Sequence, residues 1–188
     1  MKHAFATHEH RFRKPSPMTS RNIELKAHLR DLEMARRFAE SISTKRLDTQ
    51  EQVDTYFHCR EGRLKLREIN RESAQLIAYA RFDDPSPKPS DYHLVQVTAP
   101  EALKAAMSAA LGVRAIVRKR REIFLYNNVR IHLDDVEGLG CFLELEAVLG
   151  PEIDDAIGYA QLDDLMQKLD IRREDLLSNS YGEMVNAP

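Results

Sequence analysis

Apolar and polar residues alternate along eight segments of this chain, and this period of two is typical of β-strands that bury one face. The clearest segment is 141–148, where two glutamates alternate with apolar residues. Segment 21–28 repeats the arrangement, with Glu24 and Lys26 on its polar face. The apolar residues of these two segments are Ile23, Leu25, Ala27, Leu143, Leu145 and Ala147. Both segments are therefore predicted to be strands, one near each end of the sequence, that meet side by side if the sheet closes.

The remaining segments are assigned in the same way. Further strands are predicted at 53–59, 63–69, 74–82, 92–98, 115–126 and 129–136. Apolar residues three and four positions apart predict helices at 31–43, 100–111 and 152–169, with a short helix near 172–177. Segment 83–91 is predicted to be a surface loop, because its alternating prolines cannot donate ladder hydrogen bonds. The result is an α+β domain in which antiparallel hairpins dominate.

The polar faces of these strands are strongly charged. Their carboxylates are Glu24, Asp134, Glu144 and Glu146. Their cations are Lys26, Lys65, Arg67, Arg81, Lys119, Arg121 and Arg130. In an open sheet such a face would simply meet water, and the pattern alone fits this arrangement as well as it fits a closed barrel.

The alternative is a closed barrel with a charged interior. An isolated buried ion costs many kcal/mol, so such an interior persists only if water and ligands fill it. An excess of cations over carboxylates suits a polyanion, and clustered carboxylates could hold Mg²⁺ or Mn²⁺ beside phosphate oxygens. A barrel of this composition would be a triphosphate site.

Composition narrows the class of protein. The 188 residues fit one domain, and 28 basic against 30 acidic residues argue against a general nucleic-acid-binding protein. Two distant cysteines, no apolar run of membrane-spanning length and no signal-peptide pattern lead us to expect a cytoplasmic protein without a membrane partner. Residues 1–20 are predicted to be a flexible basic tail, and 183–188 a C-terminal tail.

Several ordered motifs resemble those of the CYTH superfamily, the triphosphate tunnel metalloenzymes, and most of all its class IV adenylyl cyclase branch. The family's E-x-E-x-K signature stands here as Asn22-Ile23-Glu24-Leu25-Lys26. Further matches are 62–68 (Gly-Arg-Leu-Lys-Leu-Arg-Glu), 117–121 (Val-Arg-Lys-Arg-Arg), 131–146, which ends in the Glu-Leu-Glu strand, and Ser180-Tyr181. The resemblance covers residues 21–182, which we take as a single CYTH domain.

The resemblance implies an eight-stranded antiparallel β-barrel, or tunnel, with helices packed outside. It implies a substrate that is ATP or another triphosphate, a cofactor of one or two Mg²⁺ or Mn²⁺ ions, and a monomer or homodimer. The implied metal ligands are Glu24, Asp134, Glu144 and Glu146. The implied triphosphate-binding residues are Lys26, Lys65, Arg67, Arg81, Lys119, Arg121 and Arg130, of which Lys26, Lys119 and Arg121 would also be catalytic.

The chain departs from the family signature at Asn22, where the family has glutamate. An amide oxygen brings no charge, so metal affinity should fall. The remaining carboxylates could suffice, one metal could bind only with substrate, or catalysis could be lost and binding retained. His132 shares the parity of Asp134, and a structural role for it is weighed equally with nucleotide contact. Glu137 is weighed equally as a metal ligand and as a turn residue.

Four functions therefore stay open from the sequence. A cyclase would convert ATP to cyclic AMP and pyrophosphate, whereas a triphosphatase would hydrolyse inorganic, nucleoside or thiamine triphosphate. A non-catalytic polyphosphate- or nucleotide-binding protein would keep the cavity without turnover. An RNA-binding protein would need aromatic residues beside the cations, for which Tyr79 and Tyr92 are the candidates. The cyclase is slightly favoured, and no nucleic-acid partner is expected.

Overall fold

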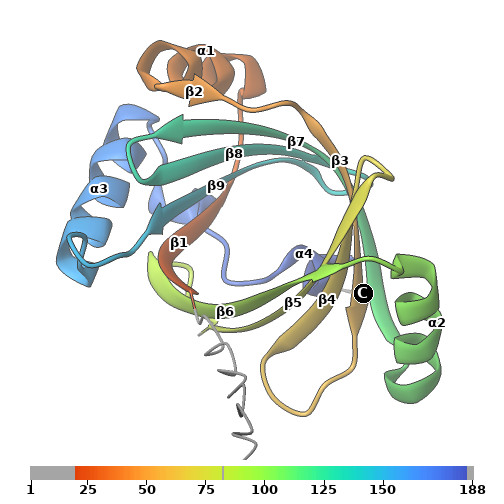
Figure 1. Ribbon diagram of the computed structural model, residues 1–188. Helices are drawn as coiled ribbons and strands as arrows, with labels where there is room; N and C mark the ends of the chain where they lie inside the picture. Colours follow the sequence, from red (N-terminus) through yellow and green to blue (C-terminus); the bar gives the residue numbers. More distant parts are fainter. Residues whose placement is uncertain (1–19, 82, 186–188) are drawn as a thin grey trace, which may run out of the picture.

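Eight antiparallel strands close into a barrel in the computed structural model, which describes residues 20–81 and 83–185 and, of Arg81, the backbone alone. Neighbours around the ring follow the order β7-β3-β4-β5-β6-β1-β9-β8, and β8 pairs again with β7 (Figure 1). The strands are β1 (Ser20–His28), β3 (Gln50–Phe57), β4 (Arg63–Ile69), β5 (Ser73–Arg81), β6 (Lys88–Val97), β7 (Val113–Tyr126), β8 (Val129–Val136) and β9 (Gly140–Val148). The predicted closed barrel is confirmed, and the open sheet was the wrong alternative.

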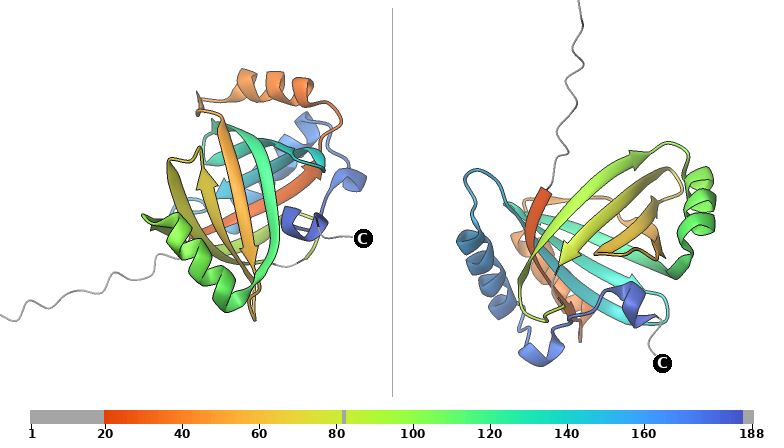
Figure 2. Two further views of the ribbon diagram at one scale, coloured as in Figure 1. Left: turned by 90° about the vertical axis from the view of Figure 1, so that its right-hand side faces the viewer. Right: turned by 90° about the horizontal axis from the view of Figure 1, so that it is seen from below.

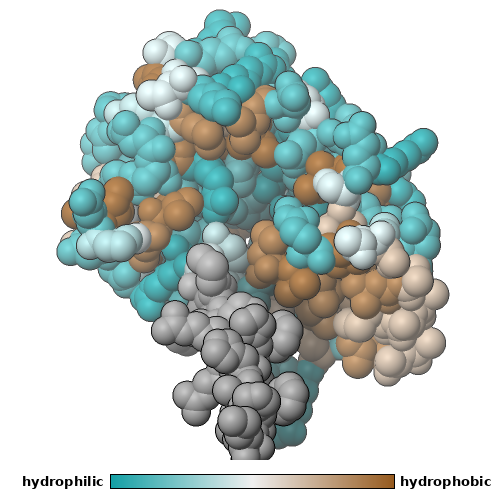
Figure 3. All heavy atoms as spheres, in the orientation of Figure 1, coloured by the Kyte–Doolittle hydropathy of each residue, from teal (hydrophilic) through white to brown (hydrophobic). Residues whose placement is uncertain are grey.

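Helices cover the outside of the barrel at two places (Figure 2). Helices α1 (Leu32–Ile42) and α3 (Asp155–Lys168) pack over β1 and β7–β9, whereas α2 (Pro100–Leu111) packs over β3 and β4. Figure 3 shows hydrophobic side chains gathered over α2 on an otherwise largely hydrophilic face. Among the described helices, none is long and apolar enough to cross a membrane.

Hydrophobic clusters lie between the barrel wall and these helices. The outward-facing apolar residues of β1 and β9 are almost fully buried beneath α1 and α3. Burial of one such leucine contributes roughly 1.5–3 kcal/mol. The residues that form this contact are Ile23, Leu25, Ala147, Leu143, Leu145, Leu162 and Leu165. Because alternation places the apolar residues outward, the charged residues of the same strands must face the lumen.

The C-terminal segment fills one end of the lumen. Helix α4 (Tyr181–Met184), which the sequence did not predict, places Tyr181 against Phe142, with 5.0 Å between ring centroids. Glu183 of the same helix bonds Arg63 at 3.0 Å. The apolar cluster at this end comprises Tyr56, Ala115, Val117, Val136, Phe142 and Tyr181. The interior is therefore apolar at this end and charged further along the barrel.

Element boundaries differ from prediction at three further places. Strand β6 begins at Lys88, inside the expected loop 83–91, because Ser90 pairs with Asn22 of β1. Pairing with β5 ends at Ser90, so Pro89 has a neighbouring strand on one side alone and its missing N–H is tolerated. The short helix expected near 172–177 is a 3₁₀ turn, Arg173–Asp175, and a two-residue strand β2 (Lys45–Arg46) pairs with β7. The predicted tail 1–20, apart from Ser20, and residues 186–188 lie outside the described residues.

Candidate functional site

A cavity of about 310 Å³ occupies the barrel interior. It gathers most of the charged residues that the sequence singled out, from five different strands. Those that line it are Glu24, Lys26, Lys65, Arg67, Lys119, Arg121, Arg130, Glu144 and Glu146. Asp134 lies beneath Arg121, and the side chain of Arg81 is outside the described part of the structure.

Strand register explains why these side chains meet. Lys26 lies opposite Glu144, and Glu24 lies opposite Glu146, so β1 and β9 present their charges to each other across one ladder. The pairing of β7 with β3 runs continuously from Arg121 to Ala115, which keeps Lys119 and Arg121 inside and Arg118 and Arg120 outside. Glu137 is exposed in the β8–β9 turn, so the turn assignment holds.

The basic part of the cavity surrounds Asp54, a residue that the sequence reading missed. Its fully buried carboxylate bonds Lys65 at 2.9 Å, Arg67 at 2.7 Å and Lys119 at 3.2 Å. Burial raises the pKa of Asp54, but the three cations more than reverse this and hold the pKa well below its ordinary value. The signal was present, because Gln50, Gln52 and Asp54 continue the polar parity of β3.

A second cluster forms around Arg121. Its guanidinium bonds both oxygens of Asp134 at 2.6 Å and also bonds Glu144. The Tyr181 hydroxyl donates to Asp134 at 2.8 Å, and Lys26 Nζ lies 3.8 Å above the Tyr181 ring. Both Asp134 oxygens are therefore occupied by protein donors, and the role of Asp134 as a metal ligand stays a prediction.

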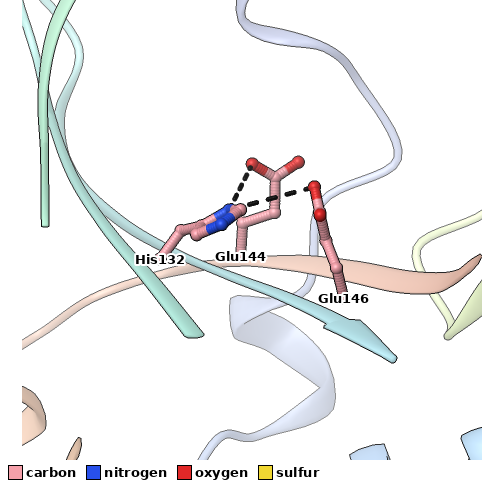
Figure 4. A group of neighbouring side chains, drawn as sticks. All are labelled: His132, Glu144 and Glu146. Atoms are coloured by element: carbon pink, nitrogen blue, oxygen red, sulfur yellow. Dashed lines mark ion pairs between the residues drawn. The ribbon is translucent and has the colours of Figure 1, made fainter. Parts of the chain in front are cut away.

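The acidic part of the cavity lies on β8 and β9. One ligand atom each from His132, Glu144 and Glu146 lie within 4.8 Å of one another, and Figure 4 shows the three side chains converging. Burial raises the pKa of Glu144, but Lys26 and then Arg121 lower it well below its ordinary value. Two ionised carboxylates beside a buried imidazole are a donor set that fits a divalent cation. Sequence reasoning placed His132 on this face but did not group it with the carboxylates.

Asn22 also lines the cavity, where it is buried. Within the described residues its side-chain oxygen has no hydrogen-bond partner. This position, where the sequence departs from the family signature, therefore faces the cavity with an uncharged acceptor.

Aliphatic side chains, four from strands and one from a loop, also line the cavity alongside Tyr92. They are Leu47, Ile69, Ile77, Leu94 and Ile123. The cavity can therefore hold an anion at its charged residues and an apolar group beside them.

Comparison with known proteins identifies the family of this barrel. The CYTH domain matches residues 20–181, so the chain belongs to the CYTH family. A Methanocaldococcus jannaschii protein named as a candidate adenylate cyclase is 32% identical over 76 residues, which are 39% of this chain and 43% of that relative. The aligned segment of the chain thus spans less than half the length of that relative.

Two solved structures share the fold. The PH1012 protein of Pyrococcus horikoshii superimposes with a TM-score of 0.76 at 27% identity, covering 88% of this chain and 99% of that one. A Hippeastrum protein, described as a candidate adenylyl cyclase with a dominant triphosphatase activity, gives a TM-score of 0.60 at 12% identity, covering 88% and 93%. CYTH proteins of this kind carry adenylate cyclase or triphosphatase names, and the family acts on triphosphates with the help of metal ions.

Proposed function

We propose that this protein converts ATP to cyclic AMP and pyrophosphate with the help of Mg²⁺ or Mn²⁺. The observation that supports this proposal is one cavity that combines a cluster of cations, a group of carboxylates and several aliphatic side chains. A linear triphosphate matches the cations, and a purine base matches aliphatic side chains that inorganic triphosphate could not use. The name of the Methanocaldococcus relative agrees with this choice.

The residues have distinct roles in this proposal. Lys65, Arg67 and Lys119 would bind phosphate oxygens, as Arg81 and Arg130 would from neighbouring strands. Lys26 and Arg121 lie between these cations and Glu144, where they would stabilise charge on the leaving pyrophosphate. Glu144 and Glu146, with Glu24 and Asp134 on adjacent strands, are the candidate cation ligands. A bound divalent ion would neutralise phosphate charge and polarise the phosphorus.

The reaction needs the ribose near the same residues. The 3′ oxygen forms a bond to the α-phosphorus, the bond from the α-phosphorus to the bridging oxygen breaks, and pyrophosphate leaves while the hydroxyl proton is released. The barrel supplies rigid strands, so the phosphates and the ribose are held in fixed positions. A cavity whose far end is filled by Tyr181 and Phe142 limits how deeply the phosphates can enter.

Hydrolysis of a triphosphate is the second candidate. The Hippeastrum structure, with its dominant triphosphatase activity, shows the same fold, and water needs no base pocket to attack the terminal phosphorus. Under this alternative the same cations and carboxylates act, and the aliphatic side chains have no role. A binding protein without turnover is the third candidate, and Asn22 is the residue that motivates it.

One product analysis separates the three. The purified protein is incubated with ATP, GTP or tripolyphosphate and either Mg²⁺ or Mn²⁺, and the products are resolved by chromatography. Cyclic AMP with an equal amount of pyrophosphate is the expected result. Inorganic phosphate without cyclic nucleotide would replace the cyclase by the triphosphatase. Tight tripolyphosphate binding with no product from any substrate would leave a binding protein.

Replacing Asn22 by Glu is expected to tighten Mn²⁺ binding about tenfold, because ligand charge sets affinity for hard cations. Without metal, the added buried carboxylate should lower the melting temperature, and saturating Mn²⁺ should restore it. Isothermal titration calorimetry and thermal melts measure both effects. The control Gln167→Glu adds the same charge on the exposed surface of α3. Equal Mn²⁺ affinity in Asn22→Glu and the native protein would place Asn22 away from the ion.

Triphosphate binding is expected to weaken as the pH rises through 8. Burial and, to a smaller extent, Arg67 lower the pKa of Lys65 to about 8, so its ammonium loses its charge as the pH rises through 8. The Kd of tripolyphosphate, measured by calorimetry without metal, should rise about tenfold between pH 7 and 9.5, since a charged hydrogen bond is worth about 1.5–3 kcal/mol. Lys65→Arg should remove this rise, because a guanidinium stays charged.

The control is Lys104→Arg on the outside of the barrel. Lys104 pairs with Glu68, and this variant should keep the native dependence of Kd on pH.

The lowered pKa of Lys65 gives a second check, on the stability of the ligand-free protein. Between pH 8 and 10.5 the unfolded Lys65 binds more protons than the folded one, so its contribution to the free energy of unfolding rises with pH. A Kd that is flat with pH in the native protein would remove Lys65 from the binding site.

A further inference from the structure

His132 is a buried imidazole with an unused nitrogen. Its side chain comes from β8, directly opposite Glu144 of β9, and is 4% exposed. Within the described residues its Nδ1 atom has no hydrogen-bond partner. A buried polar atom without a partner costs about 1–3 kcal/mol, so its persistence calls for a ligand that the protein alone does not provide.

The geometry around this nitrogen is that of a coordination site. Nδ1 lies 3.7 Å from Glu144 Oε2 and 3.8 Å from Glu146 Oε1. Both distances are too long for hydrogen bonds and shorter than twice a metal–ligand bond of about 2.1 Å, so one ion could bond to the nitrogen and to either carboxylate. Figure 4 shows the imidazole directed toward the two carboxylates.

The protonation form of the His132 ring decides whether the ring can bind an ion. A neutral imidazole keeps a lone pair on one nitrogen, and this is the form that binds metal ions.

We propose that His132 Nδ1 is a ligand of the cation held by Glu144 and Glu146, and that this nitrogen makes the site prefer Mn²⁺ to Mg²⁺. This inference rests on the proposed function, because it takes this ion to be the one that the reaction uses. Mg²⁺ takes oxygen ligands in near-ideal octahedral geometry and loses its waters reluctantly. Imidazole suits first-row transition metals better, so one nitrogen among oxygen ligands shifts the preference toward them.

Electron spin echo spectroscopy tests the nitrogen directly in the native protein with Mn²⁺ and no nucleotide. Expected is a ¹⁴N modulation from a coordinated imidazole, which disappears in His132→Gln. The control His93→Gln, on an exposed position of β6, should keep the modulation. A variant with glutamine at His3, His8 and His10 should also keep the modulation. This result would exclude Mn²⁺ binding by the predicted N-terminal tail. Tightly bound Mn²⁺ without ¹⁴N modulation in the native protein would overturn the proposal.

Affinity measurements test the selectivity. His132→Gln should weaken Mn²⁺ binding about tenfold or more and change Mg²⁺ binding by less than about threefold. Equal losses for both ions would overturn the claim of preference. Because the native protein alone gives the spectroscopic result, a variant that folds poorly does not remove the test. Both readouts are taken without substrate, so a protein that binds Mn²⁺ through nitrogen but forms no cyclic AMP would contradict the proposed reaction and leave this ligand assignment standing.

Discussion

Glu144→Gln is expected to lower kcat/KM for ATP by about 100- to 1,000-fold, the loss typical of removing one group that stabilises transition-state charge. Glu144 lies at the junction of three groups. Its carboxylate pairs with Lys26 at 3.2 Å, bonds Arg121 and faces His132. The amide cannot supply the charge that a divalent ion requires, and it leaves two buried cations with less compensation.

Steady-state assays of cyclic AMP formation and Mn²⁺ calorimetry would measure the two consequences of Glu144→Gln. The control Glu137→Gln removes an exposed carboxylate from the β8–β9 turn and should retain native activity and native metal affinity. Circular dichroism establishes that both variants fold. Full turnover and unchanged Mn²⁺ affinity in a folded Glu144→Gln protein would exclude Glu144 from the metal site and from the reaction.

Asp54→Asn is expected to lower the free energy of unfolding of the ligand-free protein by about 3–5 kcal/mol, the cost of breaking a buried ion pair from one side. Asp54 is the counterion of Lys65, Arg67 and Lys119, and its carboxylate is completely buried. A bound triphosphate brings its own negative charge to these three cations. Tripolyphosphate should therefore stabilise Asp54→Asn by more than it stabilises the native protein, and its Kd should be lower in the variant.

Urea unfolding with and without tripolyphosphate measures both quantities. The matched control is Asp135→Asn, which changes an exposed carboxylate on the opposite face of β8 and should shift the free energy of unfolding by less than about 0.5 kcal/mol. Equal stabilisation of the native protein and Asp54→Asn by tripolyphosphate would show that the ligand does not contact these cations. The role of Asp54 would then be structural alone.

The orientation of most site residues could be predicted before any tertiary structure was considered. Alternation is a local property of an extended chain, so Leu145 on the outside requires Glu144 and Glu146 on the inside. Alternation likewise separates Lys119, which is buried, from Arg118, which is exposed. It failed at Pro89, where a residue that usually ends strands is accepted because β5 pairs no further than Ser90.

The partners of these residues could not be predicted in the same way. Asp54 meets Lys119 only because β3 pairs with both β4 and β7, and Tyr181 meets Asp134 only because the C-terminal segment enters the barrel. Such contacts join residues 47 to 65 positions apart in sequence. No local pattern records their distances.

The sequence by itself therefore determined which side chains share the charged face of the strands, the excess of cations among the predicted site residues and the family signature, because each follows from strand period and residue type. Only the tertiary structure decided that the ring closes, that Asp54 pairs with three cations and that His132 Nδ1 lies 3.7 and 3.8 Å from two carboxylates. These features depend on strand register around a closed barrel. Register is set by the packing of the whole apolar outer face and not by any one segment.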